Sequence, residues 1–110
     1  MDKVIGMKFD GGKIDYSLVP PLSDEEVAKV LTIGANKYER DNWRHVDNAN
    51  IRYYAAMMRH IKDWRKGNKV DEETGCQHLA HAICCLIFLL EKDLEAVQAN
   101  IVSKSNKTKD

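Results

Sequence analysis

Residues 78–90 read HLAHAICCLIFLL, and this stretch decides the fold. From Leu79 to Leu90 nearly every side chain is apolar, and only His81 interrupts the run. About a dozen such residues are too few to cross a bilayer and are typical of a buried helix. A helix that is apolar on every side has to be covered on every side. One small helical domain cannot do this alone, so the pattern predicts a homo-oligomer.

A first helix is expected upstream, behind an irregular N-terminal segment that covers residues 1–22. The Pro20-Pro21 pair prevents helix formation there and forces an extended approach. Ser23, followed three residues later by Glu26, has the spacing of a capping box. The first helix should therefore begin at Asp24.

Two more helices are expected in the rest of the chain. Residues 50–66 repeat apolar side chains at spacings of three and four, which predicts a second helix that Gly67 ends. Residues 71–74 would open the third helix, because acids are favoured in a first turn. The expected fold is all-α, with three main helices in a single domain over 1–102, followed by a flexible polar tail over 103–110.

The composition limits the possible partners. The 110 residues contain 17 basic and 17 acidic side chains, so the formal charge is zero and no nucleic acid polymer is expected to bind. Cys76, Cys84 and Cys85 form no CxxC pair, and the chain begins with no signal-peptide pattern. These features favour the reducing cytoplasm, and no stretch is long enough to be a membrane span.

Titratable side chains gather around the start of the expected third helix. His78 and His81 lie three residues apart, Asp71 and Glu73 precede them, and antiparallel packing of the second helix would add His60. One interpretation is a divalent-metal or phosphate site; oxygen ligands suit magnesium or manganese, and imidazoles favour cobalt, manganese or zinc. The other is that the histidines hydrogen-bond across the helix pair and the acids cap a helix. The residues alone leave both open.

Two other groups have the chemistry to hold a nucleotide. Lys8, Asp10 and Lys13 flank a Gly-Gly loop whose backbone N–H groups could cradle phosphates, although such a loop is also an ordinary turn. Asn42 and Trp43, preceded by Lys37 and Tyr38, combine an amide, aromatic rings and a cation, which suits a base; Trp43 could instead cover the end of the bundle.

Taken in order, the motifs resemble a known family. They are GMKFDGGK at 6–13, Pro20, GANKY at 34–38, Asn42-Trp43, Arg59-His60, DEETG at 71–75 and HLAHA at 78–82. Together they are similar to the N-terminal domain of the phage dATP/dGTP diphosphohydrolases, over about residues 6–92. That family is distantly akin to the all-α MazG-like NTP pyrophosphohydrolases, whose ExxE…ExxD acid set this chain does not reproduce.

The resemblance implies metal-dependent hydrolysis of dGTP or dATP to monophosphate and pyrophosphate in phage nucleotide metabolism, within the host cytoplasm. It implies a divalent metal (Mg, Mn or Co) and a purine nucleotide partner. The implied metal or acid–base residues are His60, Asp71, Glu73, His78 and His81, with Glu73 as the first candidate base and His78 as the second. The implied nucleotide-binding residues are Lys8, Asp10, Lys13, Lys37, Asn42, Trp43 and Arg59.

Two alternatives need no catalysis. The site contains more histidine and cation than clustered acid, which suits an anti-defence phage sponge that sequesters a nucleotide or a nucleotide-derived host signal. The other is a structural helical oligomer whose subunits are held together through the polar residues of the segment 59–82. Incubation with nucleotide and metal would separate all three.

Overall fold

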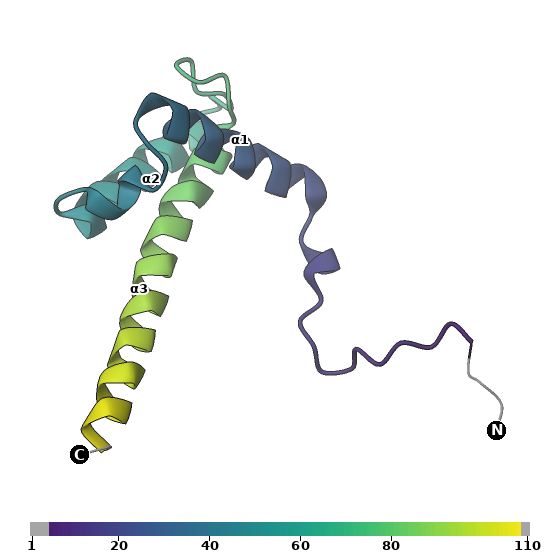
Figure 1. The fold of residues 1–110 in the computed structure, drawn as a ribbon. Coiled ribbons are helices and arrows are strands. Elements are labelled where there is room, and N and C mark those ends of the chain that lie inside the picture. Colours follow the sequence, from purple (N-terminus) through teal and green to yellow (C-terminus); the bar gives the residue numbers. More distant parts are fainter. Residues whose placement is uncertain (1–4, 109–110) are drawn as a thin grey trace.

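The computed structural model describes residues 5–108 and contains three α-helices and two short 3-10 helices (Figure 1). The α-helices are α1 (Pro21–Lys37), α2 (Ala49–Arg65) and α3 (His78–Thr108); the 3-10 helices are η1 (Tyr16–Leu18) and η2 (Asn42–His45). Within the described range, β-pairing is limited to one isolated bridge between Val70 and Gln77. The all-α prediction is confirmed. Residues 1–4 of the expected N-terminal segment and 109–110 of the expected tail lie outside the described residues.

Helix α1 begins three residues earlier than predicted. Pro20 precedes it in an extended conformation, and Pro21 occupies the first turn, where the fixed φ of proline suits a helix and its missing N–H is not needed. No side chain caps this end, so the expected capping box is wrong. Glu26, its expected acid, instead accepts a hydrogen bond of 3.2 Å from the backbone N–H of Gln77.

Helix α2 agrees with its prediction to within one residue at each end. Asn48 precedes it in the left-handed conformation, with φ 54°. Gly67, with φ 102°, lets the chain turn away after the last residues of the helix. The amphipathic spacing identified this helix correctly because it packs one face against a neighbour, which is the arrangement that such spacing reports.

Helix α3 starts seven residues later than predicted. The acids expected in its first turn form a separate loop, where Asp71 accepts hydrogen bonds of 3.0 Å from the N–H and the hydroxyl of Thr74. Gly75, with φ 72°, completes this turn and donates to the backbone oxygen of Asp71 at 2.8 Å. A short polar side chain that satisfies nearby backbone groups competes with helix formation, and here it wins.

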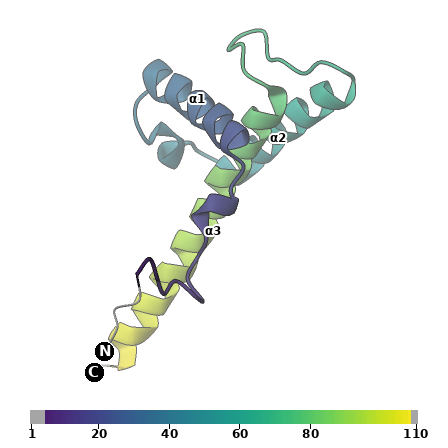
Figure 2. The same cartoon turned by 90° about the vertical axis from the view of Figure 1, so that its right-hand side faces the viewer.

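Helices α2 and α3 pack antiparallel, and α1 crosses α3 near its start (Figures 1 and 2). At one end His60 meets His78, and at the other Tyr53 meets Phe88. The core is small and gathers where the helices meet; its buried apolar residues are Val27, Ala49, Cys76, Ala80, Ala82, Cys84 and Cys85. Burial raises the pKa of the Cys84 thiol to about 12, which makes it an inert core group.

The two ends of the chain leave this core. Helix α3 continues to Thr108, past the predicted domain end at 102, because residues 103–108 contain neither glycine nor proline to stop it. Its far half extends beyond α1 and α2, and the segment ahead of α1 trails away from the bundle (Figures 1 and 2). No described helix has the length and apolarity needed to cross a membrane.

Candidate functional site

Three histidines meet where the end of α2 lies against the start of α3. The Nδ1 atoms of His60 and His78 are 2.8 Å apart, and the ring of His60 stacks on that of His81 with centroids 4.5 Å apart and planes 7° from parallel. Two unprotonated ring nitrogens cannot hydrogen-bond, so one of the two Nδ1 atoms carries a proton and donates it. A metal ion could replace that proton, since a lone pair would then be free on each ring.

The loop before α3 adds a carboxylate to the histidines. Asp71 Oδ2 accepts from Thr74, and the Thr74 hydroxyl lies 2.7 Å from His81 Nε2. His81 Nε2 is itself 3.8 Å from Asp71 Oδ2. The turn in which Asp71 accepts hydrogen bonds from Thr74 keeps residues 71–75 out of α3. The same turn places Asp71 beside the imidazoles.

A second carboxylate approaches from α2. His78 Nε2 lies 4.0 Å from Asp63 Oδ2, while the His78 side chain is only 7% exposed. Neither Asp63 nor Thr74 is among the site residues predicted from the sequence. Asp63 could have been found, because it follows His60 by three residues and shares its helix face.

The surroundings hold these groups in the protonation states that metal binding needs. Burial lowers the pKa of His60, and the neighbouring His81 and His78 lower it further. Burial also lowers the pKa of His81, against the opposing effect of Asp71. Burial alone would raise the pKa of Asp71, but the hydrogen bonds from Thr74 and the nearby histidines keep it below its usual value. A neutral imidazole at His60 and at His81, and an ionised carboxylate at Asp71, are therefore favoured at pH 7.

The donor set fits a divalent cation. His60, Asp71 and His78 each offer one ligand atom, and these atoms lie within 4.8 Å of one another. Ligand bonds of about 2.1 Å need donors roughly 3–4 Å apart, so a small side-chain adjustment would close the group around an ion. Two imidazoles with one carboxylate suit manganese, cobalt or zinc better than magnesium, which prefers oxygen.

Glu73 lies outside this cluster. Its side chain is 70% exposed and pairs with Lys37 Nζ at 2.8 Å. The expectation that residues 71–74 open the third helix is therefore wrong for Glu73, which belongs to the loop, because α3 begins only at His78. The contact with Glu73 raises the pKa of Lys37, which is consistent with a stable ammonium there.

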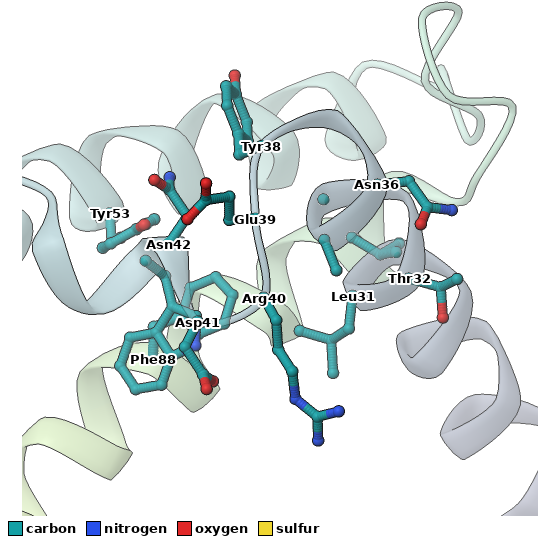
Figure 3. Close-up of a pocket in the computed structure, with 14 residues that line it drawn as sticks. Leu31, Thr32, Asn36, Tyr38, Glu39, Arg40, Asp41, Asn42, Tyr53 and Phe88 are labelled. Atoms are coloured by element: carbon teal, nitrogen blue, oxygen red, sulfur yellow. The ribbon is translucent and has the colours of Figure 1, made fainter.

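A cavity of about 530 Å³ opens between the end of α1, the η2 segment, α2 and Phe88 of α3 (Figure 3), about two turns of α2 away from the histidine cluster. Its polar lining includes Tyr38, Asn42 and Tyr53, and burial raises the pKa of the Tyr53 hydroxyl. A second hollow of about 500 Å³ shares these three residues and adds Arg59. Both volumes are in the range of small-molecule sites. Asn42 and Arg59, two predicted nucleotide-binding residues, are thus brought to neighbouring hollows.

Trp43 has both ring faces covered. One face stacks on Phe88, with centroids 4.8 Å apart and planes 13° from parallel, and the Arg44 guanidinium lies 4.3 Å from the centre of the ring. Arg44 is in turn paired with Glu95 of α3. A base could stack on Trp43 only if Arg44 moved away. The geometry favours the other interpretation given above, in which Trp43 covers the end of the bundle.

The Gly-Gly loop lies apart from the histidines. Lys8, Asp10 and Lys13 are exposed, and the Lys13 N–H donates to the Asp10 backbone oxygen at 3.1 Å in a simple turn. The segment that carries them points away from the helices (Figure 1). The structure does not bring these three residues to the histidine cluster of the same chain.

The site thus combines an all-α fold with a cluster of histidines and Asp71 where α2 meets the start of α3. Residues 3–101 match the family described as dATP/dGTP diphosphohydrolase, N-terminal, and the chain belongs to that family. A "dATP/dGTP diphosphohydrolase" of Salmonella phage PMBT28 is 45% identical over 84 residues, which cover 76% of this chain and 28% of that protein. The chain thus spans about a quarter of that relative. No solved structure gives a significant match.

Proposed function

We propose that this domain binds a purine deoxynucleoside triphosphate, dGTP or dATP, and hydrolyses it to monophosphate and pyrophosphate with a divalent metal. The observation that carries the proposal is the convergence of His60, Asp71 and His78. The family and the name of the phage relative support the substrate class. The setting would be phage nucleotide metabolism in the host cytoplasm, with the domain acting as a homo-oligomer.

The cluster supplies the metal and proton-transfer roles. His60, Asp71 and His78 would hold manganese or cobalt, and Asp63 would orient His78 through its second nitrogen. When bound, such an ion polarises phosphoryl oxygens and makes water a better nucleophile. His81, neutral because burial lowers its pKa, would accept the proton of the attacking water.

This assignment of the base differs from the sequence-based choice of Glu73. The carboxylate of Glu73 pairs with Lys37 at the surface, whereas His81 hydrogen-bonds to Thr74 and stacks on the ring of His60. A general base has to lie within reach of the water it deprotonates. His81 stacks on His60, one of the candidate metal ligands, and is therefore our candidate for this role.

The nucleotide would lie along α2. Tyr38, Asn42 and Tyr53 offer hydrogen-bonding groups for a base, and Arg59 offers a cation for phosphates. Tyr53 and His60 are seven residues apart, which is about 10 Å along a helix. A nucleoside in the cavity could thus extend its phosphates toward the cluster. In this arrangement Lys8 and Lys13 contribute only through movement of the N-terminal segment or from another copy.

The test is incubation with dGTP or dATP and Mn²⁺ or Co²⁺, with chromatography of the products. The expected products are the monophosphate and pyrophosphate in equimolar amounts, and Asp71→Asn should abolish them. Asp24→Asn, which changes an exposed acid on α1, is the matched control and should retain full turnover. Intact nucleotide recovered from denatured protein, without product, would refute hydrolysis and favour the sequestering sponge. An absence of binding would refute both.

A further inference from the structure

Helix α3 carries an apolar seam that the described chain leaves partly exposed, most of all in the outer part of the helix. Ile83, Ile87, Leu90, Leu94, Val97 and Ile101 follow one another at spacings of four, three, four, three and four residues. Alternating spacings of three and four define the contact positions of a coiled coil. The last four of these side chains are between 52% and 61% exposed, although they are large and apolar.

The surface area of the chain indicates how much burial is missing. A compact monomer of 12.6 kDa exposes about 6,200 Å² by the usual scaling of area with mass, whereas this chain exposes 9503 Å². Its radius of gyration is 19.5 Å, against about 13 Å for a compact domain of this length. A stable dimer removes roughly 800 Å² from each partner. The excess area of each chain is several times that amount; the exposed N-terminal segment accounts for part of it and the seam for another part.

We infer that two copies of this chain pair through the seam, with their α3 helices antiparallel. Glu91 and Asp93 flank the seam on its two sides, and Gln98 and Asn100 follow them about two turns later. In an antiparallel pair centred between residues 95 and 96, Glu91 lies beside the partner's Gln98 and Asp93 beside the partner's Asn100. No like charges face each other along the seam, so the surface is self-complementary.

The next seam position selects the orientation. Lys104 follows Ile101 by three residues and continues the pattern. In a parallel pair the two Lys104 ammonium groups would face each other, which is unfavourable. In the antiparallel pair each Lys104 lies beside the partner's Ile87, where its aliphatic stem covers apolar surface while the charge reaches water.

The inference is independent of catalysis, and its test is the mass of the full chain in solution. Sedimentation equilibrium at 5–100 µM, a range on the order of typical micromolar dissociation constants, should give twice the chain mass. Leu94→Glu should shift the chain to the monomer, because it puts two carboxylates into the middle of the seam. Ala96→Glu, on the opposite side of the same helix, should leave the dimer intact. Circular dichroism verifies that both variants stay helical.

Orientation is tested with Lys104→Cys, since the three natural cysteines are buried. The antiparallel pair predicts a dimer that forms no disulfide between the introduced thiols under mild oxidation. Rapid and complete disulfide formation would overturn the antiparallel arrangement. A wild-type monomer at 100 µM, a high concentration for a specific dimer, would overturn the inference and assign the seam to another polypeptide. Equal behaviour of Leu94→Glu and Ala96→Glu would also overturn it.

Discussion

Replacing Asp71 by asparagine tests the cluster most directly. Asp71 accepts two hydrogen bonds from Thr74 and lies 3.8 Å from His81 Nε2. Hydrogen bonds to a charged group contribute about 1.5–3 kcal/mol and those to a neutral group about 1 kcal/mol. The amide in Asp71→Asn can still accept from Thr74, so the metal-free variant should lose about 1–2 kcal/mol. For a chain of this size that lowers the melting temperature by roughly 5–15 °C.

The effect on metal binding should be larger and separable. An ion present at one hundred times its dissociation constant stabilises the folded state by about 2.7 kcal/mol, or roughly 10–20 °C in melting temperature. The wild type should show this rise with Mn²⁺ or Co²⁺, reversed by EDTA, while Asp71→Asn should show none. Asp63→Asn, which removes only an orienting partner, should weaken affinity by about 10–100-fold. An equal rise in the wild type and Asp71→Asn, or no rise in either, would refute the proposed ligand set.

Three further outcomes are expected. The free energy of unfolding, measured by denaturant titration, should fall as the pH drops below about 6.5. The reason is that the pKa values of His60 and His81 are lowered in the folded state, so the unfolded chain takes up protons first. A flat profile between pH 7.5 and 5.5 would contradict this. Glu73→Gln should leave turnover nearly unchanged, since its exposed carboxylate pairs with the Lys37 ammonium, and loss of product formation would restore Glu73 as the base. Trp43→Ala should destabilise the fold by about 2 kcal/mol, because its side chain can no longer stack on Phe88. Trp43→Phe should retain most of the stability. Equal melting temperatures for the two variants would show that the stacking contributes nothing.

The sequence predicted those parts of the fold that depend on regular spacing. The repeat in 50–66 located α2 because one face of that helix packs against α3. The same packing brings His60 to His78, as the expected antiparallel pair required. Four of the five predicted metal residues, His60, Asp71, His78 and His81, meet for this reason, and only Glu73 does not.

The errors arise where local hydrogen bonds compete with a helical pattern. Acids at 71–73 look like a helix start, yet Asp71 closes a turn with Thr74 and Gly75. Pro21 begins α1 ahead of the polar pair that looked like its cap. The cavity beside Tyr53 was not predictable, because its walls come from α1, η2, α2 and α3, whose relative placement no local pattern encodes. Trp43 was ambiguous for the same reason until its neighbours Phe88 and Arg44 were known.

Helix α3 has a consequence for how ligand occupancy should behave. It starts in the histidine cluster at His78 and continues for 31 residues, far past the other helices. If two copies join around residues 95 and 96, the two clusters stand about 50 Å apart at opposite ends of a shared rod. Neither cluster could then donate a side chain to the other, and each would bind its ligand independently of the other. Titration of such an assembly should give a Hill coefficient of about one.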